Sequence, residues 1–170
     1  MIAITIINSI NVKPDCTFFI EKYLVRLKFE TLKIRLKEQQ NNAKHVAYFL
    51  STQDKVKKLF YLGNLEEGSR MHEIYKKQYK SPGAMISFEI HGGEKEAFKF
   101  LNSLKIIKLA VSLGSTESLA QHPASMTHIG LAPEDKKKFG ITDNLIRLSI
   151  GVENIKDILE ELDEAFKAIK

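Results

Sequence analysis

The sequence contains a single cysteine, Cys16, among 170 residues. One thiol excludes an internal disulfide framework and favours a reducing compartment. The sequence also lacks any apolar run close to the ~20 residues that a membrane-spanning helix needs. Its opening, MIAITIINSI, is apolar but short, and neither a preceding basic residue nor a small-residue cleavage pattern accompanies it, which argues against a signal peptide. We therefore expect a cytoplasmic protein that does not enter a membrane.

Charge of one sign is not concentrated in any part of the chain. Lys and Arg number 26 against 21 Asp and Glu, for a net charge of +5. The lysines are scattered over KKQYK (76–80), DKKKFG (135–140) and the stretch 22–37, and neither an aromatic-interleaved RNA-binding motif nor a recognition-helix pattern accompanies them. This distribution indicates a solvated basic surface, and we expect no nucleic-acid partner. The apolar fraction of 44% and the chain length are typical of one globular domain.

Several familiar catalytic and metal-binding motifs are also missing. In the stretch SLGSTESLAQHPASMTH (112–128), His122 and His128 are six residues apart with Pro123 between them, which is not the spacing of two metal ligands on one helix. LGSTES is not a G-x-S-x-G nucleophile elbow, and IHGGEK lacks the ending of a phosphate-binding loop. We therefore expect no metal site and no Ser/His hydrolase.

The hydrophobic pattern predicts alternating helices and strands. Apolar residues at three-, four- or seven-residue spacings favour a helix within 23–50, and a continuous apolar stripe favours a final helix over 155–169. β-Branched and aromatic runs that end at glycines or turns predict strands within 55–63, 83–93, 105–113 and 144–151. Helices that cover a sheet in this order form an α/β sandwich. The first twenty residues fit neither pattern, and we expect them to form an arm.

One charged residue lies within a predicted apolar strand. Arg147 stands inside LIRLSI, and Ser112, Leu113 and Gly114 lie at the end of another predicted strand. An arginine in such a place either forms a structural ion pair or binds an anion, and its planar guanidinium suits a carboxylate because it can donate two parallel hydrogen bonds. The residues alone leave both interpretations open.

The stretch AVSLGSTESLAQHPASMTHIGLAPEDKKKFGITDNLIRLSIGVENIKDILEELDEAF (110–166) resembles a known family. It is similar to the C-terminal domain of the Cys/Met-metabolism pyridoxal-phosphate (PLP) enzymes, which include methionine γ-lyase, cystathionine γ-lyase and cystathionine γ-synthase. The resemblance implies an α/β fold, namely the small C-terminal domain of a fold-type I PLP enzyme. We then expect a mainly antiparallel sheet of about four strands, covered by helices and preceded by a long helix. The implied domain is 21–170, after an unmatched arm at 1–20.

The resemblance also implies roles for particular residues. Arg147 matches the arginine that binds the substrate α-carboxylate, and Ser112 and Leu113 match strand-end residues that line the same pocket. Thr127 matches a threonine near the side of this domain that faces the cofactor, and we count it with the substrate-binding residues. Val111, just before Ser112, and the stretch HPASMTH are more similar to methionine γ-lyases and acylhomoserine sulfhydrylases than to cystathionine γ-lyases, which often carry an acid at the Val111 position. The implied substrate is a sulfur amino acid, from which the intact relatives, as homo-oligomers, eliminate a thiol.

The family's larger N-terminal domain carries the lysine that bonds to PLP, an aspartate for its pyridine nitrogen, an aromatic ring that stacks on it, and phosphate-binding residues. We find none of these motifs in the sequence. The resemblance therefore predicts a truncated or split enzyme that supplies the carboxylate-binding wall but no catalytic residue and does not hold PLP by itself. Its partner would be a cofactor domain or a full-length homologue. The alternatives are a non-catalytic interaction module and a gene remnant.

Overall fold

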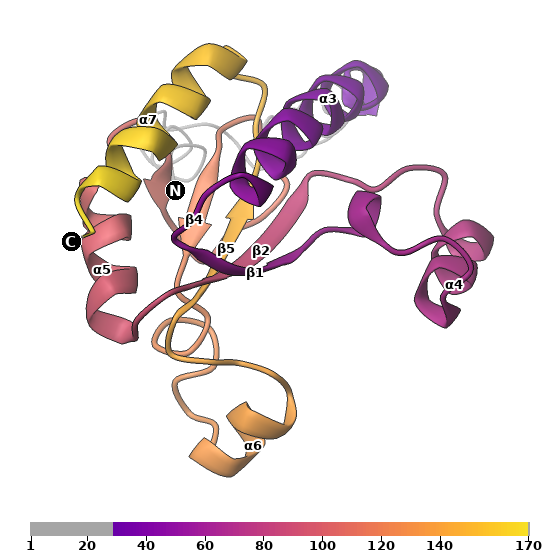
Figure 1. Cartoon of the computed structure of the whole chain (residues 1–170). Coiled ribbons are helices and arrows are strands. Elements are labelled where there is room, and N and C mark those ends of the chain that lie inside the picture. The colour runs from indigo at the N-terminus through magenta and orange to yellow at the C-terminus, as the bar shows by residue number, and fades with distance from the viewer. Residues whose placement is uncertain (1–28, 170) are drawn as a thin grey trace, which may run out of the picture. The chain divides into compact units, whose positions relative to one another are not determined.

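The computed structural model describes residues 29–169, and the expected arm at 1–20 lies outside that range. The chain divides into two compact units, Met1–Arg35 and Leu36–Lys170, and the sheet belongs to the second. The helices are α3 (Leu32–Ser51), α4 (Arg70–Gln78), α5 (Glu94–Ser103), α6 (Pro133–Lys138) and α7 (Ile155–Lys167), with a short 3-10 helix at Leu62–Asn64 (Figure 1). The strands are β1 (Val56–Phe60), β2 (Met85–Ile90), β3 (Lys108–Leu109), β4 (Leu119–Gln121) and β5 (Leu145–Ser149).

The sheet is mainly antiparallel, as expected. Its strand order is β1-β2-β5-β4-β3, and only the β3–β4 pair is parallel. Two details differ from the sequence prediction. The strand expected within 105–113 pairs only at Lys108 and Leu109, and β4 lies in the stretch 112–128, where no strand was predicted. Three residues are too few to display the period-two alternation from which a strand is recognised.

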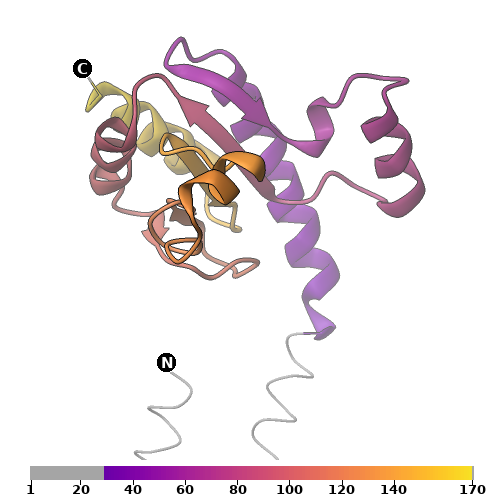
Figure 2. The same ribbon diagram turned by 90° about the horizontal axis from the view of Figure 1, so that it is seen from below.

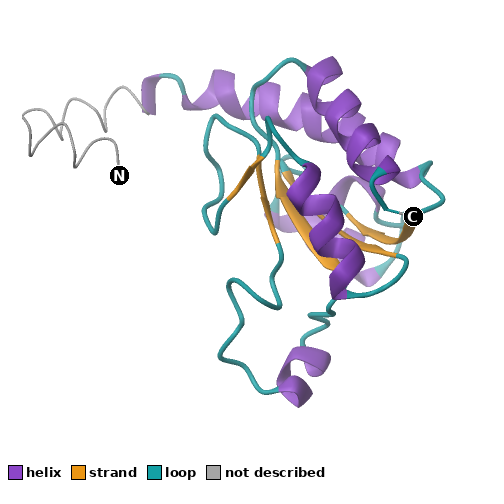
Figure 3. Ribbon diagram, turned by 90° about the vertical axis from the view of Figure 1, so that its left-hand side faces the viewer, coloured by secondary structure: helices purple, strands orange, loops and turns teal. Residues whose placement is uncertain are grey.

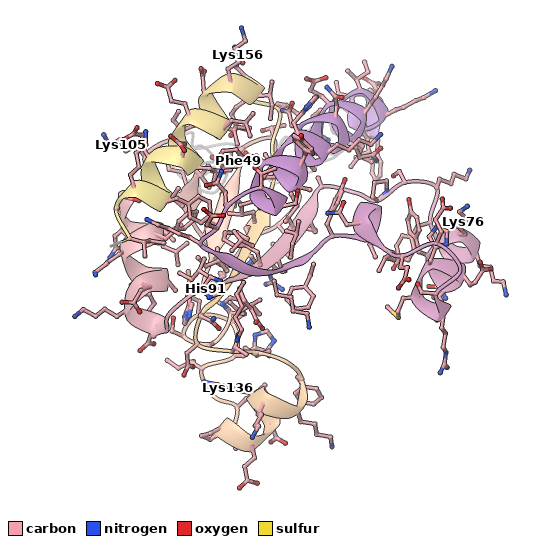
Figure 4. All side chains as sticks on the ribbon, in the orientation of Figure 1. Phe49, Lys76, His91, Lys105, Lys136 and Lys156 are labelled. Carbon is pink, nitrogen blue, oxygen red and sulfur yellow. The ribbon has the colours of Figure 1, made fainter. Side chains whose placement is uncertain are left out.

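Three helices cover one face of this sheet. The core contains residues from α3, α5 and α7 together with the strand residues that point toward them, all of them apolar and buried: Val46, Leu50, Phe100, Leu162, Phe166, Ile86, Phe88, Ile146 and Leu148. Figure 3 shows these helices against the strands, and Figure 4 shows side chains filling the space around Phe49, whose ring lies 6.3 Å from that of Phe166. The expectation that the final helix covers the sheet is confirmed.

Two segments extend away from the sheet. Residues 61–84 carry α4 between β1 and β2, and α4 lies to one side of the sheet in both Figure 1 and Figure 2. α6 was not predicted from the sequence, although Pro133 at its start, acidic residues in its first turn and lysines in its last turn are typical of a helix. None of the helices within 29–169 combines the length and hydrophobicity needed to cross a bilayer.

Candidate carboxylate-binding site

Arg147 lies on the face of the sheet opposite to the three helices. Alternate residues of a strand point to opposite faces, and the β5 neighbours of Arg147, Ile146 and Leu148, are fully buried in the core. Directly across from Arg147 are Ser87 on β2 and Gln121 on β4. Residues directly opposite in an antiparallel pair share a face, so Ser87, Arg147 and Gln121 form a polar row across three strands.

The guanidinium of Arg147 is only partly satisfied. Its Nη2 donates a hydrogen bond to Oε1 of Gln121 at 2.8 Å, whereas its buried Nε has no hydrogen-bond partner. Burial lowers the pKa of Arg147 from its ordinary value. An arginine nevertheless stays protonated in proteins, so the side chain carries a partly desolvated positive charge with a donor to spare.

No carboxylate within residues 29–169 neutralises that charge at ion-pair distance. The acid on the same face, Glu89, lies 3.9 Å from Nζ of Lys57 and accepts a hydrogen bond from the hydroxyl of Thr142 at 3.3 Å. The structural ion pair considered from the sequence is therefore not formed among these residues. A planar cation with an unpartnered donor is an arrangement to which a ligand carboxylate can bind.

The loop between β3 and β4 reaches this face at the end of β5. The backbone N–H of Gly114 donates to Oγ of Ser149 at 2.9 Å, and Ser149 follows Arg147 by two residues on the same face of β5. Two residues of an antiparallel strand span about 7 Å. Ser112 and Leu113 immediately precede Gly114, so the structure brings the loop that carries them to the end of the strand that carries Arg147.

The sequence-predicted residues differ in their surroundings. Ser112 is exposed and Leu113 is 45% exposed, which leaves both side chains accessible at the loop. Thr127 is exposed as well, but its hydroxyl lies 2.8 Å from Nδ1 of His128 and 3.4 Å from the carbonyl of Pro123. In the described part of the chain, no hydrogen bond joins Thr127 to the Arg147 row.

His122, one of the two histidines in the stretch 112–128, makes structural contacts. His122 is fully buried, with Nε2 at 2.7 Å from the carbonyl of Asp143 and Nδ1 at 2.7 Å from the hydroxyl of Ser125. Because a carbonyl only accepts, Nε2 carries the proton. Its ring also meets that of Phe98 edge-on at 5.0 Å. Residues 29–169 contain no group of three His, Cys, Asp or Glu side chains suited to a metal ion.

Sequence reasoning missed three residues around the site: Gln121, Ser149 and Gln39. Ser149 could have been placed, because the predicted strand 144–151 puts it on the same face as Arg147. Gln121 could not, since β4 was not recognised. Gln39 donates from α3 to the carbonyl of Ser115 at 2.5 Å, a contact between segments 76 residues apart that no local pattern reports.

Comparison with known proteins identifies the family. A family model described as Cys/Met metabolism PLP-dependent enzyme matches residues 19–167. The chain belongs to this family. It is 46% identical over 147 residues to L-methionine gamma-lyase of Fusobacterium nucleatum subsp. polymorphum, which covers 86% of this chain and 36% of that relative. The predicted family membership is confirmed, and the family depends on PLP.

Solved structures of the Cys/Met metabolism family share the fold. Cystathionine gamma-lyase of Micromonospora echinospora superposes with a TM-score of 0.79 at 36% identity, over 85% of this chain and 37% of that one. Cystathionine gamma-synthase of Xanthomonas oryzae pv. oryzae, solved with aminoacrylate and cysteine, gives a TM-score of 0.75 at 39% identity, over 82% of this chain and 35% of that one. The expected fold-type I relationship is confirmed. The chain spans little more than a third of the length of these relatives.

Proposed function

We propose that this chain supplies the carboxylate-binding wall of a PLP-dependent enzyme that eliminates a thiol from a sulfur amino acid, in the manner of methionine or cystathionine γ-lyases. The observation that supports the proposal is the unpartnered donor of the half-buried Arg147. The relatives named above are lyases and synthases of sulfur amino acids, and every amino acid substrate presents an α-carboxylate. A carboxylate that accepts from the guanidinium would neutralise a half-buried cation that has no acidic partner at ion-pair distance within 29–169.

The lysines of the described residues do not fit the group that would bond to PLP. Such a lysine has to be desolvated beside the cofactor to be reactive. Within 29–169 all lysines but Lys55 and Lys136 are exposed. Lys55 donates to the carbonyls of Phe166 and Ile169, and Lys136 donates to that of Ala124 at 2.9 Å. We therefore propose that a partner, either a cofactor domain or a full-length homologue, holds PLP and supplies the proton-transfer lysine.

The roles left to this chain are binding and orientation. Arg147 would hold the carboxylate in the plane of its guanidinium, and Gln121 would keep that plane fixed through the bond to Nη2. The exposed Leu113 would offer apolar surface beside the substrate side chain, and Ser112 a hydroxyl. Orientation by such groups favours reaction because it removes freedom before the chemical step.

The test is a titration of the isotope-labelled full chain with L-methionine, followed by NMR at the Nε–H of Arg147 and, in every variant, at the backbone amides of β5 and of the loop 112–118. Because Nε has no partner, the proposal expects saturable shifts of both signals in the parent chain. The backbone amide shifts should be absent in Arg147→Ala and only partly restored in Arg147→Lys. L-Methioninol, which lacks the carboxylate, should cause no such shift. Arg70→Ala, at an exposed arginine on α4, is the matched control and should bind L-methionine as the parent chain does. Equal binding by Arg147→Ala and Arg70→Ala would contradict the proposal.

The lyase assignment needs a second experiment. Addition of a cofactor domain from a relative to this chain should produce PLP-dependent thiol release from L-methionine. In that mixture, Arg147→Ala should lower kcat/KM by about 30-fold to several hundred-fold, which corresponds to about 2 to 4 kcal/mol for an unpaired charge. Carboxylate binding without thiol release in any such mixture would instead favour the non-catalytic interaction module.

A further inference from the structure

The loop that carries Ser112 and Leu113 is anchored on both sides of these residues. Before them, the β3–β4 ladder holds the chain, with Ala110 N–H donating to the carbonyl of Ala120 at 3.1 Å. After them, the first anchor is the bond from Gly114 N–H to Ser149. Within 29–169, neither Ser112 nor Leu113 makes a side-chain hydrogen bond of its own. The position of this pair is therefore set by its neighbours.

Further anchors follow between residues 115 and 118. Gln39 of α3 donates to the carbonyl of Ser115 at 2.5 Å, and Val152 N–H donates to the carbonyl of Thr116 at 2.9 Å. Glu153 accepts from both the N–H and the hydroxyl of Ser118, at 2.5 and 2.9 Å. All these groups come from α3 or from the turn after β5, so the loop is tied to elements that are themselves fixed in the core.

Two of the anchors are buried polar side chains, and one of them stands where an apolar residue would be expected. Ser149 is 1% exposed and Gln39 is 2% exposed. Gln39 falls within the apolar stripe of α3, between Leu36 and Ala43, and a polar residue at a core position lowers stability unless it is hydrogen-bonded. Each has a bond to the loop backbone, and Ser149 in addition stands two residues from Arg147 on one strand face.

We infer that Ser149 and Gln39 are positioning residues for the substrate, because they hold the loop 112–118 at a fixed distance from Arg147. This inference rests on the proposed function. Arg147 alone would bind any carboxylate, whereas the loop can contact only a ligand that extends beyond the carboxylate. Loss of either anchor should therefore weaken the binding of an amino acid more than the binding of a short carboxylate.

The experiment compares L-methionine with acetate as probes, using the NMR titration of the full chain. Ser149→Ala removes the acceptor of Gly114 N–H, and Gln39→Ala removes the donor to Ser115. Each should weaken L-methionine binding about tenfold, as expected for one lost positioning hydrogen bond, and should leave acetate binding within about twofold of the parent chain. Ser149→Thr, which keeps the hydroxyl, should recover most of the L-methionine affinity.

The matched control is Ser103→Ala, which removes a hydroxyl that donates within α5 to the carbonyl of Phe100 at 2.6 Å. It should change neither affinity. Amide exchange at Gly114 should be faster in Ser149→Ala and unchanged in Ser103→Ala. If both anchor variants bind L-methionine as tightly as the parent while Arg147→Ala does not bind it, the positioning inference is wrong and the proposed function stands. If Arg147→Ala itself binds normally, the proposed function fails first, and the inference fails with it.

Discussion

The two faces of the sheet differ in how completely their side chains are satisfied. On the helix-covered face, Ile86, Phe88, Ile146 and Leu148 are fully buried among apolar neighbours. On the opposite face, Arg147 is half-buried with an unpartnered Nε, and Met85 and Phe60 stay 37% and 39% exposed. The first face accounts for stability, since burial of apolar surface is the main driving force of folding. The second carries a desolvated charge, which stabilises nothing until it has a partner.

The two faces are joined where the loop 112–118 meets the turn after β5. Ser149 belongs to the Arg147 face, yet Gly151 and Glu153, which follow it, join the network that includes Asn42 of α3. Nδ2 of Asn42 donates to the carbonyls of Gly151 and Glu153 at 3.3 and 2.9 Å. The packed helix-covered face therefore helps to fix the position of the polar site on the Arg147 face. Functional groups are held accurately in place when rigid elements of the fold support them.

The largest effect should come from truncation on the helix-covered face. Phe88 packs against Phe100 and Phe166, with ring centroids at 5.7 and 6.2 Å, so Phe88→Ala should lower the free energy of unfolding by about 3 to 5 kcal/mol. Met85→Ala, three residues away on the opposite face, should cost less than about 1 kcal/mol because its side chain is already partly in water. Urea denaturation of both variants measures the contrast. Similar losses would mean that the Met85 face is covered in solution.

The next largest effect should come from a substitution at Gly151, in the turn after β5 that contacts the loop 112–118. A Cβ at Gly151 would lie 2.6 Å from the carbonyl carbon of Glu117 and would overlap the carbonyl oxygen of Thr116. These are backbone atoms that cannot rotate away, so Gly151→Ala should cost about 2 to 3 kcal/mol and displace the loop. The same change at Gly93, where a Cβ would meet nothing within 4 Å, is the control and should cost less than about 1 kcal/mol. Both are read from thermal unfolding, and equal costs would show that the loop does not lie against the turn.

The contrast between the faces also explains what could be predicted from sequence. The stripe of α7 and the apolar runs of β2 and β5 are continuous local patterns, and the structure has these elements where they were expected. β4 was missed because its three residues lie among polar ones. Arg147 stood out because it is one charge within an apolar strand. Gln39 carried a comparable signal as a polar residue in an apolar stripe, but its partner Ser115 depends on tertiary packing.

A smaller effect should appear at the margin of the sheet, where Tyr61 follows β1. Burial raises the pKa of Tyr61 to about 12, and its hydroxyl donates to the carbonyl of Gly83 at 3.4 Å across the base of the segment 61–84. The unfolded chain releases this proton near pH 10. The contribution of Tyr61 is therefore fully present below about pH 10 and is lost as the pH rises toward 12.

Tyr61→Phe should remove the loss of stability that Tyr61 causes at high pH, because phenylalanine has no proton to release. The difference in unfolding free energy between the parent chain and Tyr61→Phe should shift by up to about 2 kcal/mol between pH 9 and 11.5, in favour of the variant at high pH. Tyr48→Phe, at a tyrosine that is 73% exposed, is the control. A shift of the same size in Tyr48→Phe would show that burial of Tyr61 is not its cause.

The smallest net effect should come from replacing the polar pair on the Arg147 face. Arg147→Met alone leaves Oε1 of Gln121, a residue 1% exposed, without its donor, and should cost about 1 to 2 kcal/mol. The double variant Arg147→Met with Gln121→Leu replaces both partners by apolar groups, and also removes the unpartnered Nε. Such a replacement is often neutral or stabilising, so its unfolding free energy should lie within about 1 kcal/mol of the parent value. In the titration with L-methionine, however, the double variant should show no binding. If the double variant keeps its stability and loses L-methionine binding, Arg147 and Gln121 serve a ligand. If instead it loses several kcal/mol of unfolding free energy, the two residues hold the sheet together.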